Sequence, residues 1–243
     1  MNCTVYFLSI RNDSMKKTAL ILFFGIIFGS LHVFSQSGTN QMDAQGKRNG
    51  VWKKTYEGST QLRYEGNFEH GKEVGEFKFY CLECKDKPTV TKNFNSKDDI
   101  ADVKYYTIKG KLVSEGKMKD KDRIGEWVYY HEKSKNVMTR ENYVDGKLDG
   151  KVITYYPNGK ITEEISYKNG IKEGEDNYYS PEGVLLKKLL YREDQLQGPG
   201  FYYDANGNLV IEGFYKDDKK HGLWKYYKDG KVVLEETYPK PDK

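Results

Sequence analysis

The sequence has little cysteine and histidine, the residues that most often hold metal ions. Only 3 cysteines and 4 histidines occur among its 243 residues. The histidines are scattered, and no two have the spacing of a metal-ligand pair: His32, His70, His131 and His221. One Cys-x-x-Cys pair is present, but no second pair or spaced histidine completes a zinc site around it. A redox role would require a thioredoxin-like βαβ context, which is missing. We therefore expect no metal and no cofactor.

An excess of charge of one sign is lacking as well. The chain has 40 basic and 36 acidic residues, and their signs alternate, as in residues 216–220. Such a surface offers no basic stripe for nucleic acid, so we expect no nucleic-acid partner. The sequence also lacks a nucleophile elbow, a phosphate-binding loop and a catalytic triad. A chain of near-identical repeats offers no single asymmetric pocket, so we expect that this protein is not an enzyme.

The only strongly apolar run lies near the N-terminus. It covers residues 19–29 and follows Lys16 and Lys17. This run is shorter than the roughly 20 residues that a membrane-spanning helix needs. A basic segment, an apolar run and a small residue predict a signal peptide over residues 1–35, with Met15 as the natural start. The alternative is an uncleaved membrane anchor. Either way, we expect the rest of the chain in the periplasm, in the outer envelope or secreted, and residues 36–45 as a linker.

Aromatic residues and glycine are abundant: 21 tyrosines and 24 glycines favour strands and tight turns. Aromatic doublets recur every 23 to 26 residues when Tyr56 is added in front. These doublets are Phe79-Tyr80, Tyr105-Tyr106, Tyr129-Tyr130, Tyr155-Tyr156, Tyr178-Tyr179, Tyr202-Tyr203 and Tyr226-Tyr227. The recurrence predicts eight units of about 24 residues over 46–243.

Each unit has the same internal order. A glycine opens all but one of them, where Ala101 takes its place: Gly50, Gly75, Gly125, Gly150, Gly174, Gly198 and Gly222. A short aromatic segment, a turn such as Asn158-Gly159 and a second, alternating segment follow. Asn-Gly suits a two-residue hairpin turn with positive φ at both positions, and alternation with a period of two indicates a strand. The unit is therefore predicted to be a β-hairpin, with the opening glycine allowing a sharp turn between hairpins.

Residues 167–175 (YKNGIKEGE) and 214–224 (FYKDDKKHGLW) resemble the MORN repeat. The variant is the bacterial one, found in exported proteins and in proteins named as antitoxins of the YwqK family. The resemblance covers nearly all of the chain after the leader and implies a fold of stacked hairpins. Its functional implication is loose, because these repeats recur in proteins with different roles. Residues 81–102 depart from the pattern.

The predicted fold is all-β: an elongated, single-layer antiparallel sheet of about eight stacked MORN-type hairpins. Because successive residues of a strand face opposite sides, each doublet places one ring on each face. An aromatic row rimmed with charge would form a binding surface. The candidate surface comprises Trp127, Tyr130, Tyr156, Tyr179, Tyr203, Trp224 and Tyr227.

The function expected of such an array is an exported, non-catalytic scaffold that binds a protein partner. Neutralisation of a toxin, as the family's antitoxin label implies, is one alternative. Binding of a membrane lipid or a polysaccharide of the envelope is another, because rows of tyrosine and tryptophan suit both. The sequence identifies neither the partner nor the oligomeric state.

Two smaller features complete the pattern. Cys81 and Cys84 flank the residues of a predicted hairpin turn, which is compatible with a local disulfide in an oxidising compartment; a zinc half-site and free thiols are the alternatives. A glutamate recurs at one place in the second strand of four units, which indicates a structural cross-strand role: Glu115, Glu164, Glu212 and Glu235.

Overall fold

A computed structural model describes residues 38–95 and 97–240. These residues form one open antiparallel sheet of 19 strands and contain no helix. The predicted signal peptide, residues 1–35, lies outside the described residues. Within the part that the structure describes, no helix is long and apolar enough to cross a membrane.

The first half of the sheet runs from β1 to β9. Its strands are β1 (Gln41–Met42), β2 (Arg48–Thr55), β3 (Leu62–Glu69), β4 (Lys72–Phe79), β5 (Val90–Phe94), β6 (Ile100–Tyr106), β7 (Leu112–Lys119), β8 (Asp122–Tyr130) and β9 (Val137–Val144). The second half consists of β10 (Lys147–Leu148), β11 (Gly150–Tyr155), β12 (Ile161–Lys168), β13 (Ile171–Tyr179), β14 (Leu185–Arg192), β15 (Gln195–Leu196), β16 (Gly198–Tyr203), β17 (Leu209–Lys216), β18 (Lys219–Lys228) and β19 (Lys231–Tyr238).

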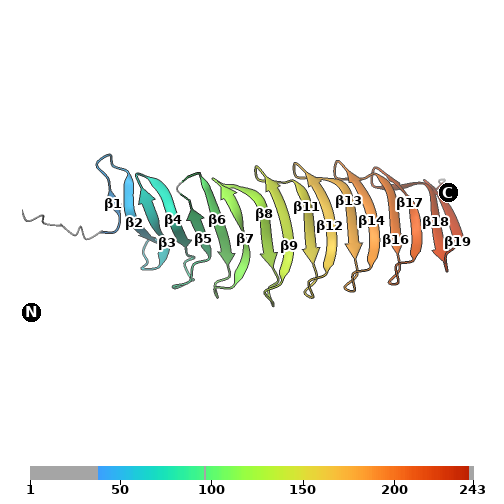
Figure 1. Cartoon of the computed structure of the whole chain (residues 1–243), viewed down its shortest axis with the longest axis horizontal. Helices are drawn as coiled ribbons and strands as arrows, with labels where there is room; N and C mark the ends of the chain where they lie inside the picture. The colour runs from blue at the N-terminus through green and yellow to red at the C-terminus, as the bar shows by residue number, and fades with distance from the viewer. Residues whose placement is uncertain (1–37, 96, 241–243) are drawn as a thin grey trace, which may run out of the picture. The chain divides into compact units, whose positions relative to one another are not determined.

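Each strand pairs with its neighbours in sequence, so the strands lie side by side in chain order (Figure 1). The short pieces β10 and β15 continue into β11 and β16 and pair with the same neighbours, β9 and β14. The prediction of a single-layer sheet of stacked hairpins is therefore confirmed. Residues 36–45, expected to be a linker, are in part structured, because Gln41 and Met42 pair with Asn49 and Arg48.

The prediction that the opening glycines form sharp turns between hairpins is wrong. Gly75, Gly125, Gly174 and Gly222 lie inside strands and all have positive φ, between 62° and 110°. At each of them the pairing with the preceding strand shifts, which marks a β-bulge. At Ala101 the pairing of β5 with β6 continues without a shift. The reason is that a side chain makes positive φ costly, so only the units with glycine form the bulge.

Five turns between units have the predicted two-residue geometry with positive φ at both positions: 70–71, 145–146, 169–170, 193–194 and 217–218. Within units the predicted geometry occurs at Asp229-Gly230, where both residues have positive φ, but not at two other turns. At Asn158-Gly159 and Asn206-Gly207 only the glycine has positive φ. This pattern is typical of longer hairpin connections, in which an ordinary turn is followed by one left-handed residue.

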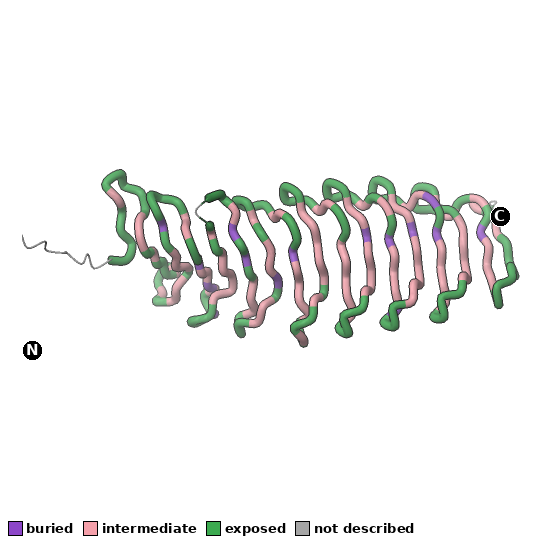
Figure 2. The backbone as a smooth tube through the Cα atoms, in the orientation of Figure 1, coloured by how far each residue is buried: buried purple, intermediate pink, exposed green. Residues whose placement is uncertain are grey.

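The two faces of the sheet have different side chains. The aromatic face bears the residue two places after each opening position, which we call the inner residue: Trp52, Phe77, Val103, Trp127, Val152, Asp176, Gly200 and Trp224. Most of the buried residues belong to this face. Most of them lie within the strands, whereas the turns are mostly exposed (Figure 2). The opposite face bears the fifth residue after each opening position, a tyrosine in seven of the eight units, and we call it the ladder face.

Candidate functional site

The aromatic face is built from rings that are covered by cations. Trp127 and Trp224 are only 0% and 1% exposed. Arg123 lies over the Trp127 ring at 4.6 Å, and Lys220 lies over the Trp224 ring at 4.2 Å. Such contacts add to the burial energy of the rings. The prediction that these two tryptophans line an exposed binding surface is therefore wrong, because neither ring can be reached by a partner.

Four of the predicted surface tyrosines lie on the ladder face: Tyr130, Tyr179, Tyr203 and Tyr227. Three of them donate a hydrogen bond to the recurrent glutamate of the preceding strand. The pairs are Tyr130 with Glu115 (2.5 Å), Tyr179 with Glu164 (3.3 Å) and Tyr227 with Glu212 (2.6 Å), and Tyr80 makes the same bond to Glu65 (2.8 Å). These four bonds form a ladder along the sheet, which agrees with the structural role expected for the glutamates.

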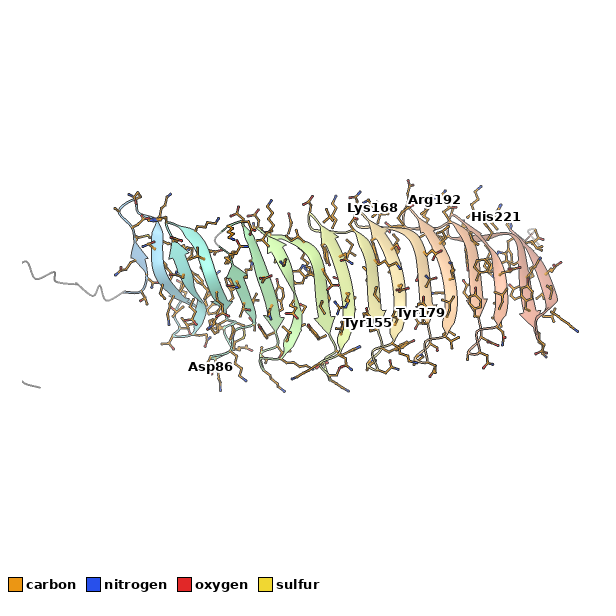
Figure 3. All side chains as sticks on the ribbon, viewed as in Figure 1. Asp86, Tyr155, Lys168, Tyr179, Arg192 and His221 are labelled. Atoms are coloured by element: carbon orange, nitrogen blue, oxygen red, sulfur yellow. A yellow bond between two sulfur atoms is a disulfide. The ribbon has the colours of Figure 1, made fainter. Side chains whose placement is uncertain are left out.

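Tyr156 is not equivalent to these tyrosines. It lies in a turn, and its hydroxyl donates to the backbone oxygen of Tyr179 at 2.9 Å. Tyr155 takes the ladder position instead. Tyr155 and Tyr179 lie near the same ends of their strands, at the lower side of the sheet in Figure 3. Counting from the opening glycine would have found this, because Gly150 precedes Tyr155 by the same five residues that separate Gly125 from Tyr130.

Cys81 and Cys84 form a disulfide within the turn that follows β4, with Cα atoms 5.0 Å apart. Cys84 is buried. The pair closes one end of the irregular segment 81–102, which contains β5 and the start of β6.

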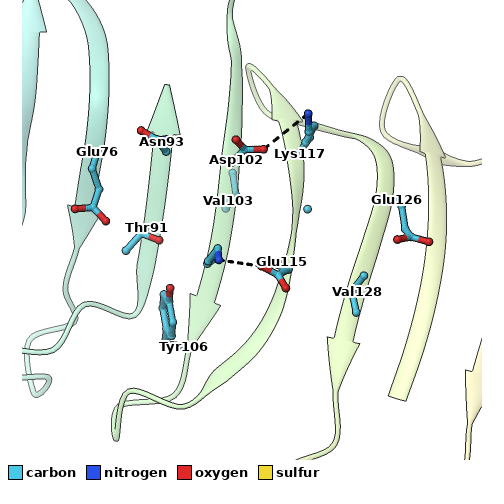
Figure 4. A pocket seen from close by; sticks show the side chains of 12 residues that line it. Glu76, Thr91, Asn93, Asp102, Val103, Tyr106, Glu115, Lys117, Glu126 and Val128 are labelled. Carbon is cyan, nitrogen blue, oxygen red and sulfur yellow. Dashed lines mark ion pairs between the residues drawn. The ribbon is translucent and has the colours of Figure 1, made fainter. Parts of the chain in front are cut away.

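A shallow depression of about 740 Å³ lies on the ladder face over β4 to β8 (Figure 4). It spans the pairing of β5 with β6, which continues past Ala101 without a bulge. The polar side chains that line it come from five strands and comprise Glu76, Thr91, Asn93, Asp102, Lys104, Tyr106, Glu115, Lys117 and Glu126. We call this depression the basin.

Every carboxylate of the basin has a cation close by. Lys104 contacts Glu115 at 3.1 Å, and Lys117 contacts Asp102 at 4.0 Å. Glu76 and Glu126 pair with Lys78 and Arg140, at 3.2 and 2.7 Å. All of these pairs are partly or largely exposed, so they contribute little to stability. They can exchange their partners for the charges of another molecule at low cost.

Glu115 is the most strongly held of these carboxylates. It accepts the Tyr130 hydroxyl and contacts Lys104, and these bonds lower the pKa of Glu115 and raise the pKa of Lys104. Burial, together with the bond to Glu115, raises the pKa of Tyr130 to about 12. All three groups therefore keep their charge states near neutral pH, which suits a fixed binding surface better than proton transfer.

Tyr106 lies at the same position of its unit as Tyr80 and Tyr130 but lacks their glutamate partner. Thr91 stands where the glutamate partner would be, and the Tyr106 hydroxyl makes no hydrogen bond to any described residue. Residues 81–102 depart from the repeat in the sequence, but this departure alone does not single out Thr91, Asn93 or Tyr106. Two signals could have found them: the alanine at position 101 and the absence of a glutamate at position 91.

Within residues 38–95 and 97–240, no cluster of three or more His, Cys, Asp or Glu side chains could hold a metal ion. The basin thus offers paired charges, a tyrosine hydroxyl and two neutral polar groups on an open surface. Such a surface can recognise a partner by shape and charge.

A sequence model of the MORN repeat variant matches residues 148–169 and 196–217. Each match covers one complete hairpin, from β10 to the turn after β12 and from β15 to the turn after β17. These two hairpins are therefore similar to MORN repeats, and the other hairpins of the sheet follow the same plan. No curated protein matches the chain.

Proposed function

We propose that this MORN-repeat protein is an exported, non-catalytic module that binds a protein partner through the basin of its ladder face. The observation that carries the proposal is the basin: a broad, open depression with charges of both signs, in the unit that departs from the repeat. Open surfaces with complementary charges favour protein partners, because the charges set the orientation and the rate of association. The leader-like N-terminal sequence supports export.

Photo-crosslinking would test the proposal. A photo-reactive amino acid at Tyr106 should capture one partner, and the purified partner should then bind the protein in solution. Replacing Lys104 and Lys117 by Glu reverses the two cations of the basin and should weaken that binding at least tenfold, a change of about 1.4 kcal/mol. Lys151→Glu is the matched control: it reverses one exposed lysine of the ladder face outside the basin and should leave binding unchanged. Equal affinity of the double variant and the control would refute the proposal.

Toxin neutralisation is a more specific form of the same function, supported by the sequence resemblance alone. In this case the captured partner is toxic when expressed by itself, and co-expression of this protein relieves the toxicity.

Polysaccharide binding is the second candidate, and Tyr106 favours it. Its ring lines the same basin as Thr91 and Asn93, and an aromatic ring among polar groups suits a sugar ring. If binding to envelope polysaccharide is lost on Tyr106→Ala but kept in the Lys104→Glu, Lys117→Glu variant, the ligand is a glycan and not a protein.

A further inference from the structure

The last strand, β19, has the sequence of an internal strand but no outer neighbour among the described residues. It pairs with β18 on one side only. Its first apolar residues are consequently exposed: Val232 by 45%, Val233 by 61% and Leu234 by 50%. The residues at the same places in β17, which has β18 beside it, are all half-buried: Leu209, Val210 and Ile211. The β19 edge therefore exposes apolar surface that a neighbouring strand covers elsewhere in the sheet.

The tyrosine–glutamate ladder ends at this edge with an acceptor that lacks its donor. Glu65, Glu115, Glu164 and Glu212 each accept a hydroxyl from a tyrosine of the next strand. Glu235 is the residue of β19 at the same position. It is exposed and makes no hydrogen bond or ion pair with any described residue. By the rule that the other four follow, the missing strand would supply a tyrosine.

An internal copy of this edge exists at β8 and β9. Trp127, Tyr129 and Tyr143 there correspond to Trp224, Tyr226 and Tyr238 at β18 and β19, in the same pairing register. Tyr143 donates to Glu141 at 2.6 Å, and Tyr238 donates to Glu236 at 2.7 Å. Likewise Arg123 donates to the Tyr129 hydroxyl, and Lys220 donates to the Tyr226 hydroxyl. The β8–β9 pair is thus a template for β18–β19.

The template shows which strand fits the open edge. On the outer side of β9 lies β11, with Ile153 opposite Arg140. The same register places Val152 opposite Glu141. Elsewhere in the sheet the inner residue is aromatic, and the residue opposite it on the preceding strand must then be a glycine, as Gly213 is opposite Trp224. Glu236 corresponds to Glu141, so the residue opposite it must be small, like Val152.

We propose that β19 receives an extended strand from another protein, which adds antiparallel to the sheet. That strand carries a small β-branched residue opposite Glu236 and, three residues later, a tyrosine that donates to Glu235, as Val152 and Tyr155 are spaced in β11. Strand addition of this kind takes its affinity from the backbone and its specificity from alternate side chains. The inference rests on the proposed protein-binding function and defines a second contact surface, distant in sequence from the basin.

A second copy of this chain does not meet these requirements. In its first hairpin strand, β2, Trp52 stands where the small β-branched residue is required and Thr55 where the tyrosine is required. Residues of β1 also pair already along the outer edge of β2. Two copies of β19 laid antiparallel about Glu235 or Glu236 would bring like charges together, which destabilises pairing. The occupant is therefore a strand of a different protein.

A synthetic peptide with the sequence of residues 147–156 (KLDGKVITYY) is the probe, because this segment already pairs with the template strand. The peptide is titrated into the full chain, and hydrogen exchange is measured along the chain. We expect slower exchange in residues 231–238 and a saturable binding curve. Replacing Val by Trp in the peptide, at the place of Val152, should abolish binding, since Glu236 leaves no room for the ring.

The hydrogen bond to Glu235 has its own test. Replacing Tyr by Phe in the peptide, at the place of Tyr155, and Glu235→Gln in the protein should each weaken binding several-fold, and the two changes together should weaken it no further. Glu132→Gln, at an exposed turn carboxylate, is the control and should leave the affinity unchanged.

Three results would overturn the inference: no slowing of exchange in β19 at millimolar peptide, equal binding of the Trp-containing peptide, or protection of β19 that rises with protein concentration when no peptide is present. The last result would identify the occupant as a second copy. None of these measurements involves the basin. A negative result at β19 would therefore not decide the crosslinking test at Tyr106, and a negative crosslinking result would not decide the test at β19.

Discussion

The indole of Trp224 lies directly on the backbone of Gly213. A Cβ atom added to Gly213 would approach the ring carbon Cδ2 to 2.1 Å. The same relationship joins Gly116 to Trp127, at 2.4 Å, and Gly66 to Phe77, at 2.3 Å. Where the inner residue is Asp176, the residue opposite is Ile165. A large inner residue is therefore matched by a glycine opposite it, and a smaller inner residue by a larger one, so that each pair fills a similar volume.

This relationship predicts a clear cost for Gly213→Ala. The added methyl group forces the Trp224 ring out of its place, and overpacking of this kind lowers the free energy of unfolding by about 1–3 kcal/mol. Unfolding in urea measures the change. The control is the same substitution in a Trp224→Val background, since valine is the inner residue at positions 103 and 152. In that background Gly213→Ala should change the free energy of unfolding little. An equal loss in both backgrounds would show that contact with the Trp224 ring is not the cause.

Trp127→Ala is predicted to act on stability and not directly on binding. The ring is fully buried, and its indole N–H donates to the backbone oxygen of Lys117 at 3.0 Å. Removing a buried tryptophan costs about 3–5 kcal/mol. Thermal unfolding should show a large loss, whereas Tyr203→Ala, at a half-buried tyrosine of the ladder face, should cost much less. If both variants unfold alike, Trp127 is not part of the structural core.

The sequence allowed the hairpin, its repetition and the single sheet to be predicted, because glycine, tyrosine and alternation recur in nearly every unit. It did not reveal which face buries its rings. Tyrosine doublets place rings on both sides, and the difference arises from the inner residue, such as Trp127, and from the glycine opposite it on the neighbouring strand. That partner lies eleven residues away in the sequence, next to a β-bulge, as Gly116 and Trp127 show. The basin could not be predicted either, since it depends on five strands lying side by side.

The ladder predicts a coupling between Tyr80 and Glu65. The Tyr80 hydroxyl donates to Glu65 at 2.8 Å, and this bond lowers the pKa of Glu65. A double-mutant cycle with Tyr80→Phe and Glu65→Gln should give a coupling energy of about 0.5–1 kcal/mol at neutral pH, a modest value because Glu65 is partly solvated.

The coupling between Tyr80 and Glu65 should also depend on pH. A carboxyl group with a lowered pKa in the folded state stabilises the fold above its unfolded pKa, and this contribution is lost as the pH falls through the folded value. Repeating the cycle in acid, below the ordinary pKa of glutamate, should therefore give a smaller coupling. Tyr203→Phe is the control, because Lys188 stands where the glutamate would be. A similar loss from Tyr203→Phe would show that the hydrogen bond is not the cause.

Asp176 is the one charged inner residue of the aromatic face, and we expect it to lower stability at neutral pH. It is 3% exposed, and its Oδ1 atom has no hydrogen-bond partner among the described residues. Burial raises the pKa of Asp176, although Lys187 and Lys172 act in the opposite direction, and burial and the nearby Asp176 raise the pKa of Glu163. Since an unpaired buried polar group costs about 1–3 kcal/mol, Asp176→Val should stabilise the fold by a similar amount at pH 7.

The pH dependence distinguishes this cause from a simple gain in packing. Because the pKa of Asp176 is raised in the folded state, the folded protein binds more protons than the unfolded chain, and its stability rises as the pH falls from above the folded pKa toward the ordinary aspartate value. The advantage of Asp176→Asn over the unsubstituted protein, measured by urea unfolding between pH 7 and pH 4, should therefore shrink in acid. Asp86→Asn, at an exposed turn residue, is the control for general effects of charge. An advantage that stays constant over this range would mean that the ionisation of Asp176 does not penalise the fold.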